Sequence, residues 1–300
     1  MSWREITSKH ADGRAVHAII LGEPRCGRVV VYHHGFPASG FEALVARKYT
    51  SDFGICIVAI DRPGLGGSDW YSNRTLADWS QDVALVMDAI GVTDFAVMAV
   101  SGGTPSAVAL TTGLPHRVKS LTIVSGVAPW GLEGATEGAN FANRAIMKMA
   151  RKRPNLAKTT VRTLAHLWRS VPWMVELWFG VLLPKQDKEI VSNKFVGGTL
   201  AKSISQAFEQ GIDGVVKEFE LLAAPWEGEL EKVKVPVHIW HGTEDTYVPF
   251  SMGRILHERI VGSTFHEIPQ GGHFMVIPLI REILAEIVSS TWSNRDIGAA

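Results

Sequence analysis

The sequence predicts an α/β fold built on a mostly parallel sheet, and three observations support this prediction. Short apolar runs rich in valine and isoleucine alternate with longer segments of helical periodicity. Several of these runs are apolar nearly throughout, which is typical of strands covered by helices on both faces. The chain has 300 residues and is 46% hydrophobic, which is enough for one large core. We therefore expect a central sheet with helices on both sides.

Seven segments have the length and composition of strands. They are residues 17–21, 28–33, 55–60, 95–100, 118–125, 237–240 and 264–268. Five segments between and after them have helical patterns, namely residues 40–53, 75–90, 102–112, 251–260 and 275–290. The pattern is clearest at 75–90, where Trp79, Val83 and Val86 fall on one face. Gly91 then occupies the position of a C-terminal glycine cap.

One long segment breaks this alternation. Residues 130–228 contain helical stretches, prolines and tryptophans but no convincing strand. We predict a core domain formed by residues 1–129 and 229–300, with residues 130–228 as an inserted helical cap. The cap is expected to cover the carboxyl ends of the strands, where open α/β sheets bind their ligands.

Aromatic side chains are frequent in and beside this cap. Most of them are expected to pack between the cap helices and the sheet, and a minority to line an apolar pocket. The pocket candidates are Trp130, Trp168, Trp173, Trp178 and Phe274.

Charge and composition argue against several functional classes. The 30 Lys+Arg and 30 Asp+Glu residues balance, so the chain offers no excess positive charge for nucleic acid. The longest apolar segment, residues 171–184, is broken by Pro172 and Glu176 and is too short to span a bilayer. Cys26 and Cys56 suggest neither a disulfide framework nor a metal site. No signal-peptide pattern follows the first residues, so a cytoplasmic location is expected.

Ser101 is the strongest candidate for a catalytic side chain. It lies in Ala99-Val100-Ser101-Gly102-Gly103, between the predicted strand 95–100 and the following helix. Small residues on both sides of a serine permit a sharp turn that exposes its hydroxyl to a base and a substrate. A serine hydroxyl is a weak nucleophile at neutral pH, so it needs a base, and that base needs an orienting acid.

Two loops further along the chain contain a suitable acid and a suitable base. Asp245 follows the predicted strand 237–240, and His273 follows the strand 264–268 after two glycines. Both are expected at the same sheet edge as Ser101. Glu244 is an alternative acid, but the spacing from His241 favours Asp245.

Other polar residues near the predicted turns have simpler expected roles. Asp61 ends a strand in Asp-Arg-Pro-Gly, a pattern that favours a turn tying loops together. His33, His34 and His241 lie beside tight turns, where hydrogen bonds to neighbouring loops are expected rather than proton transfer. The eleven histidines show no metal-ligand spacing, so no metal is predicted. Gly64-Leu65-Gly66-Gly67 lacks the spacing of dinucleotide and P-loop motifs, so no cofactor is predicted either.

From about residue 16 to residue 288, the chain resembles the α/β-hydrolase superfamily. Four motifs carry the resemblance: residues 34–37 (His-Gly-Phe-Pro), residues 61–68 (Asp-Arg-Pro-Gly-Leu-Gly-Gly-Ser), the turn at Ser101, and the paired loops of Asp245 and His273. The turn departs from the usual Gly-x-Ser-x-Gly pattern in having Ala99 first. The resemblance implies an α/β-hydrolase fold with Ser101 as nucleophile, His273 as general base and acid, and Asp245 as orienting acid.

An oxyanion hole is also implied, because charge develops on the former carbonyl oxygen during attack. The backbone N–H of Gly102, the residue after the nucleophile, is one expected donor. The resemblance places the second donor at the N–H of Phe36. Pro37 has no N–H and is excluded.

The residue at the turn also limits the reaction. Related dehalogenases and epoxide hydrolases use an aspartate there, so Ser101 argues against both chemistries. We expect hydrolysis of a carboxylic ester, or a related acyl bond, of a small to medium and mostly apolar substrate. Hydrolysis of a C–C bond beside a carbonyl and peroxide-dependent perhydrolysis remain open on the same triad. A ligand receptor that retains the triad without turnover also remains open, as does the oligomeric state.

Overall fold

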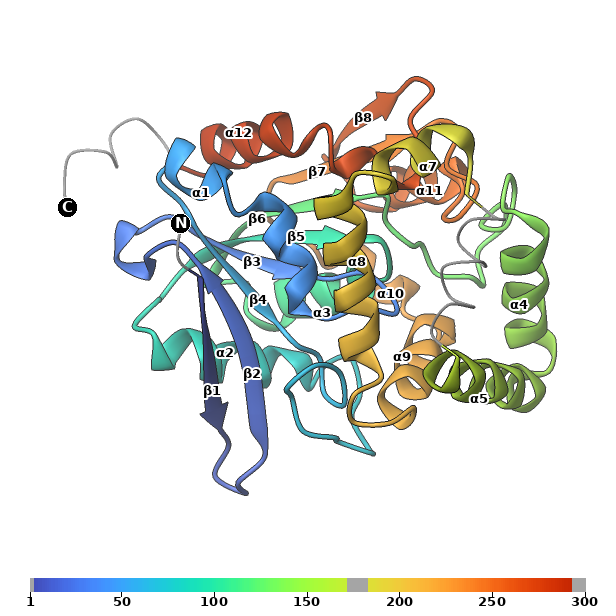
Figure 1. The fold of residues 1–300 in the computed structure, drawn as a ribbon. Coiled ribbons are helices and arrows are strands. Elements are labelled where there is room, and N and C mark those ends of the chain that lie inside the picture. The colour runs from blue at the N-terminus through green and yellow to red at the C-terminus, as the bar shows by residue number, and fades with distance from the viewer. Residues whose placement is uncertain (1–2, 172–182, 293–300) are drawn as a thin grey trace.

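An eight-stranded sheet forms the centre of the computed structural model, which describes residues 3–171 and 183–292 (Figure 1). The strand order is β1-β2-β4-β3-β5-β6-β7-β8. The strands are β1 (Trp3–Lys9), β2 (Ala15–Leu21), β3 (Val29–His33), β4 (Cys56–Ile60), β5 (Phe95–Val100), β6 (Val118–Val124), β7 (Val237–Gly242) and β8 (Thr264–Ile268). β2 is antiparallel to both neighbours, and every other pair is parallel. The predicted mostly parallel sheet is therefore confirmed.

Helices cover both faces of this sheet, because the strand side chains are apolar on both. One face packs against α2 (Trp79–Ala89), α3 (Thr104–Gly113) and α11 (Phe250–Arg259). The other packs against the 3₁₀ helix η2 (Gly40–Ala46), α1 (Tyr49–Asp52) and α12 (Ile280–Thr291). Alternate residues of β5 point to opposite faces, with Val97 and Ala99 on the first and Ala96 and Met98 on the second.

All seven predicted strands are present, and 95–100 and 264–268 have the predicted bounds. β1 was not predicted, because its largely exposed Trp-Arg-Glu-Ile-Thr-Ser-Lys sequence has no apolar run. The predicted helix 40–53 is divided into η2 and α1. α2 begins at Trp79 rather than Thr75, because the N–H groups of residues 79, 80 and 81 bond to the carbonyls three residues before them and so form tighter turns ahead of the helix. Gly91 has a φ of +73°, as its expected cap position requires.

The described residues between β6 and β7 are helical. Their helices are α4 (Phe141–Lys152), α5 (Pro154–Ser170), α7 (Lys185–Val191), α8 (Lys194–Ala207), α9 (Asp213–Ala223) and α10 (Glu227–Leu230). α4, α5 and α9 pack on one another, α8 packs on η2, and Figure 1 shows α4 and α5 set apart from the sheet. The cap boundaries at 130 and 228 stay a prediction. Among the described helices, none has the length and apolar character needed to cross a membrane.

Candidate active site

Ser101 lies at a strained turn between β5 and α3. Its φ is +52°, in the left-handed region that residues other than glycine adopt rarely. The Ser101 carbonyl accepts hydrogen bonds from the Thr104 hydroxyl at 2.8 Å and the Val127 N–H at 3.3 Å, which hold the turn in place. A Cβ at Gly103 would lie 2.6 Å from the His33 carbonyl oxygen, so this position requires glycine. The small residues of the motif thus allow the turn to approach the end of β3.

Asp245 and His273 form a buried hydrogen-bonded pair in the loops after β7 and β8. The Asp245 Oδ2 atom lies 2.8 Å from Nδ1 of His273, and both side chains are buried. The other carboxylate oxygen, Oδ1, accepts the N–H groups of Tyr247 and Val248, each at 2.9 Å. Because Nδ1 of His273 is engaged by this fixed carboxylate, Nε2 is the ring nitrogen that Asp245 does not contact.

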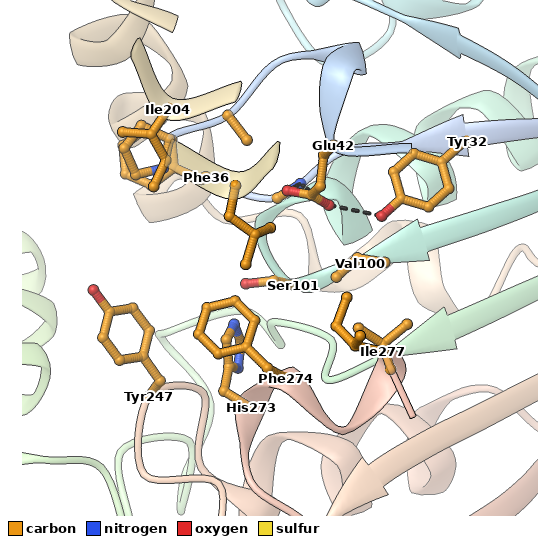
Figure 2. A pocket seen from close by; sticks show the side chains of 15 residues that line it. Tyr32, Phe36, Glu42, Val100, Ser101, Ile204, Tyr247, His273, Phe274 and Ile277 are labelled. Atoms are coloured by element: carbon orange, nitrogen blue, oxygen red, sulfur yellow. Dashed lines mark hydrogen bonds between the residues drawn. The ribbon is translucent and has the colours of Figure 1, made fainter. Parts of the chain in front are cut away.

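The serine and the histidine line one small cavity. It has a volume of about 60 Å³, and its walls include Ser101, His273, Tyr247 and Phe274. Figure 2 shows the Ser101 side chain and the His273 ring on neighbouring parts of this cavity wall. Because β5, β7 and β8 are parallel, the residues that follow them meet at the same sheet edge. The structure therefore brings Ser101, His273 and Asp245 together as expected from the motifs.

The loop formed by residues 34–37 packs directly against the turn. A Cβ at Gly102 would lie 3.3 Å from the backbone nitrogen of Phe36 and 2.5 Å from its Cβ. The two predicted oxyanion donors, the N–H groups of Phe36 and Gly102, are thus on adjacent segments. Their role in stabilising an oxyanion stays a prediction.

Arg62 holds this loop by its carbonyl groups. Its side chain is fully buried, and its guanidinium donates to the carbonyls of His34 at 2.8 Å and Gly35 at 2.9 Å. The Arg62 Nε–H donates to Oε2 of Glu218 in α9 at 2.6 Å, and Arg74 donates to Oε1 of the same carboxylate. Burial would raise the pKa of Glu218, but the two guanidinium charges lower it below its ordinary value. Glu218 is therefore an ionised partner that links α9 to this loop.

Two further buried carboxyl groups flank the site, and neither was predicted. Asp187 of α7 is fully buried and accepts the backbone N–H groups of His273 and Phe274, both at 2.8 Å. Glu42 of η2 accepts the Tyr32 hydroxyl at 2.7 Å and the Gly35 N–H at 3.2 Å (Figure 2). Asp187 gives no signal in the polar sequence of α7. For Glu42, the one signal in the sequence is an acidic residue among the otherwise apolar residues 40–46.

These carboxylates act on the protonation of the histidine. Burial alone would lower the pKa of His273. The charge of Asp245 and its hydrogen bond, followed by the charges of Asp187 and Glu42, outweigh burial and raise this pKa above its ordinary value of 6.5. The imidazolium form is thus stabilised, as a base that receives a proton during a reaction requires.

The alternatives considered from the sequence lie in other contacts. The Glu244 carboxylate accepts from the Gln186 side chain at 2.8 Å in an exposed position, so Asp245 is the acid that contacts His273. Asp61 accepts the N–H groups of Gly40 and Gly67, which confirms that it ties loops together.

The three other buried histidines near the turns all have structural contacts. His33 Nε2 accepts the Trp79 indole N–H at 2.8 Å, and burial, with the charge of Arg62, lowers the pKa of His33 to about 3. His34 Nδ1 lies 3.0 Å from the Gly35 carbonyl oxygen, and His241 Nε2 lies 2.9 Å from that of Val248. The contacts of His34 and His241 are with loop carbonyls, as expected, whereas His33 bonds to a side chain of helix α2 rather than to a loop.

A larger apolar cavity adjoins the serine. Its volume is about 340 Å³, and Ser101, Gly102, Trp130 and Trp168 are among the residues that line it. The other described pocket candidate, Phe274, lines the 60 Å³ cavity. Trp173 and Trp178 lie outside the described residues. A substrate-binding role for any of these aromatic side chains stays a prediction.

Comparison with known proteins places these features in context. Residues 28–278 match the model of a family described as alpha/beta hydrolase fold. A non-heme chloroperoxidase of Streptomyces lividans is 26% identical over 236 residues, which cover 76% of this chain and 78% of that protein. A bifunctional esterase/perhydrolase of Acinetobacter calcoaceticus is 22% identical over 231 residues, with the same two coverages. The crystal structure of a bromoperoxidase from Bacillus anthracis superposes with a TM-score of 0.69 at 16% identity, covering 95% of this chain and 99% of that one.

Proposed function

The chain belongs to the alpha/beta hydrolase fold family, and from this premise we propose that it is a serine hydrolase. Its substrate is a carboxylic ester, or a compound with a related acyl bond, of small to medium size and mostly apolar character. Ser101 is the nucleophile, His273 the general base and acid, and Asp245 the orienting acid. The backbone N–H groups of Phe36 and Gly102 form the oxyanion hole.

One observation carries this proposal. The His273 ring, bonded through Nδ1 to Asp245 at 2.8 Å, lines the same cavity as the Ser101 side chain on its strained turn. A buried carboxylate fixes the imidazole tautomer in which Nδ1 carries the proton and Nε2 is free to accept one. Such an arrangement supplies the base that a serine hydroxyl needs at neutral pH.

The proposed reaction has two halves, acylation and then deacylation of Ser101. In the first, Ser101 Oγ attacks the carbonyl carbon while its proton passes to Nε2 of His273, and the oxyanion receives the two backbone N–H groups. The C–O bond to the alcohol then breaks, and the alcohol leaves with the proton from His273. In the second half, water gives a proton to His273 and attacks the carbonyl carbon of the acyl-serine. The bond from this carbon to Ser101 Oγ then breaks, His273 returns the proton to Oγ, and the carboxylic acid leaves.

The cavities support the proposed size and polarity of the substrate. The larger one, about 340 Å³, falls at the lower end of the range of about 300–1,000 Å³ that is common for small-molecule sites. Val127, Ile146, Leu164 and Phe219 are among its lining residues. An apolar acyl or alcohol group placed there would lie next to Ser101.

The decisive experiment compares Ser101→Ala with the unaltered protein on chromogenic esters of increasing acyl-chain length. We expect the variant to lose nearly all turnover while its circular dichroism spectrum is unchanged. Ser72→Ala, at an exposed serine, is the matched control and should retain full activity. Mass spectrometry after treatment with an organophosphonate should locate the label on Ser101. Turnover by Ser101→Ala at the wild-type rate would refute the proposal.

Perhydrolysis is the second candidate, because one similar protein carries the name esterase/perhydrolase and another that of a chloroperoxidase. In this reaction hydrogen peroxide replaces water as the nucleophile that attacks the acyl-serine, and the product is a peracid. Supplying acetate and hydrogen peroxide and measuring peracid-dependent halide oxidation tests it with the same Ser101→Ala control. A cytoplasmic location, a small-molecule substrate and the absence of nucleic-acid binding stay predictions.

A further inference from the structure

A second cluster of titratable side chains lies away from the site described above. His238 comes from β7, His266 from the edge strand β8, and Glu286 from α12. One donor atom from each residue lies within 4.8 Å of the other two. Nδ1 of His238 is 3.1 Å from Oε1 of Glu286, and Nε2 of His266 is 3.0 Å from the same oxygen. None of the three residues lines the cavities that contain Ser101.

Both imidazole nitrogens face the same carboxylate oxygen. They are buried, and each lies within ion-pair distance of Oε1, but neither is well aligned for a hydrogen bond to it. Two buried nitrogens that share one oxygen in this way leave hydrogen-bonding capacity unused, which is costly. A cation between the three atoms would satisfy both nitrogens and the carboxylate oxygen at once.

We propose that His238, His266 and Glu286 bind a divalent transition-metal ion of the Zn²⁺ class. Two imidazole nitrogens and one carboxylate oxygen suit Zn²⁺ and exclude a preference for Mg²⁺ or Ca²⁺, which bind oxygen ligands. In a tetrahedral zinc site with bonds of about 2.0–2.1 Å, the ligand atoms lie about 3.3–3.4 Å apart. The nitrogen–oxygen separations of 3.0 and 3.1 Å are close to this value, and the two nitrogens lie within 4.8 Å of each other. A water molecule would complete the fourth position.

Trp240 contacts two of the three proposed ligands and orients them. Its indole N–H donates to Oε2 of Glu286 at 2.9 Å, which leaves Oε1 directed at the two histidines. The Trp240 ring also stacks on His266 with 4.1 Å between ring centroids. Groups that orient metal ligands in this way typically change metal affinity by about 10–100-fold when they are removed.

The position of the cluster indicates what the ion would do. It would join α12 to β7 and β8, the two strands whose carboxyl ends lead to Asp245 and His273. An ion bound to the folded chain in this way stabilises it by mass action. The sequence analysis predicted no metal, because the three ligands are separated along the chain and come from three different elements.

Tag-free protein stripped of metal should be titrated with Zn²⁺ by isothermal calorimetry, with thermal unfolding followed in parallel. We expect about one ion per chain and a higher Tm with Zn²⁺, but not with Mg²⁺. His266→Gln and Glu286→Gln should each weaken binding at least tenfold, and Trp240→Phe should weaken it while the three ligands remain. His116→Gln, at an exposed histidine outside the cluster, is the matched control and should bind as the wild type does.

Wild-type protein that takes up no Zn²⁺, or cluster variants that bind it as tightly as the control, would overturn the proposal. If a ligand variant does not fold, Co²⁺ bound to the wild-type protein decides the question. The visible spectrum of tetrahedral Co²⁺ with nitrogen ligands is expected. An octahedral, water-like spectrum would contradict it.

Discussion

The two loops on either side of Ser101 are both anchored by carboxylates from the helices between β6 and β7, but the two anchors differ in their charge balance. On one side, Glu218 of α9 is neutralised by Arg62 and Arg74, and Arg62 in turn holds the loop of residues 34–37. On the other side, Asp187 of α7 binds the backbone of His273 directly and adds to the charge of Asp245. The first anchor therefore only fixes the position of its loop. The second fixes its loop and also adds negative charge beside the His273 ring.

The largest loss of activity is expected on the histidine side. Asp245→Asn should lower kcat by up to about 10⁴-fold, because an amide can donate to Nδ1 and stabilise the wrong imidazole tautomer. Steady-state kinetics with a chromogenic ester measures the effect. Glu244→Gln, the neighbouring and exposed carboxylate, should leave kcat nearly unchanged. If the two variants behaved alike, Asp245 would not be the orienting acid.

On the side of Glu218, the largest effect is expected in the free energy of unfolding. Glu218→Gln leaves the buried guanidiniums of Arg62 and Arg74 without a counter-charge, which should cost about 3–5 kcal/mol of unfolding free energy. Urea denaturation measures it. Glu220→Gln on the same helix removes a partly exposed pair with Lys158 and should cost less than about 1 kcal/mol. Equal losses from the two variants would contradict the anchoring role of Glu218.

The pH dependence of kcat/KM should distinguish the two anchors, because only Asp187 places its charge near His273. The pKa of His273 is raised above 6.5. Below this raised pKa the ring is already protonated and cannot accept the Ser101 proton. The value of kcat/KM should therefore fall as the pH is lowered through a midpoint above 6.5. Asp187→Asn removes a negative charge that favours the imidazolium, so it should move this midpoint to lower pH.

Glu218→Gln is the control for this measurement, because its carboxylate faces the guanidiniums rather than His273. The midpoint in that variant should stay near the wild-type value. A midpoint unchanged by Asp187→Asn would show that Asp187 acts on the loop by position alone, and an upward shift would contradict the assigned effect of its charge.

The smallest effect is expected for Glu42→Gln. The glutamine keeps an oxygen for the Gly35 N–H and the Tyr32 hydroxyl but removes the charge that contributes least to the pKa of His273. The midpoint of the pH profile should move in the same direction as in Asp187→Asn, by a smaller amount. A larger shift than in Asp187→Asn would reverse the assigned order of the two carboxylates.

Most of the sheet could be predicted because its strands are apolar on both faces. β1 was not predicted, because an edge strand exposed to water has no such apolar pattern. Ser101, Asp245 and His273 were identifiable because each is part of a motif at the end of a strand. Asp187 was not, because it lies in the polar sequence of α7, and Glu218 was not, because a glutamate in the amphipathic helix α9 gives no sign that it is buried. Their role depends on how the helices between β6 and β7 pack, and a local sequence pattern does not specify long-range packing.

Asp187 and Glu218 also limit how far this enzyme can be rebuilt. Exchange of the segment between β6 and β7 for that of another family member is an obvious route to new specificity, since this segment forms much of the cavity wall. In this chain such a chimera would also remove the acceptor beneath the histidine loop and the counter-ion of two interior arginines. A donor segment should therefore be chosen first for acidic residues at these two places, and only afterwards for the shape of its binding surface.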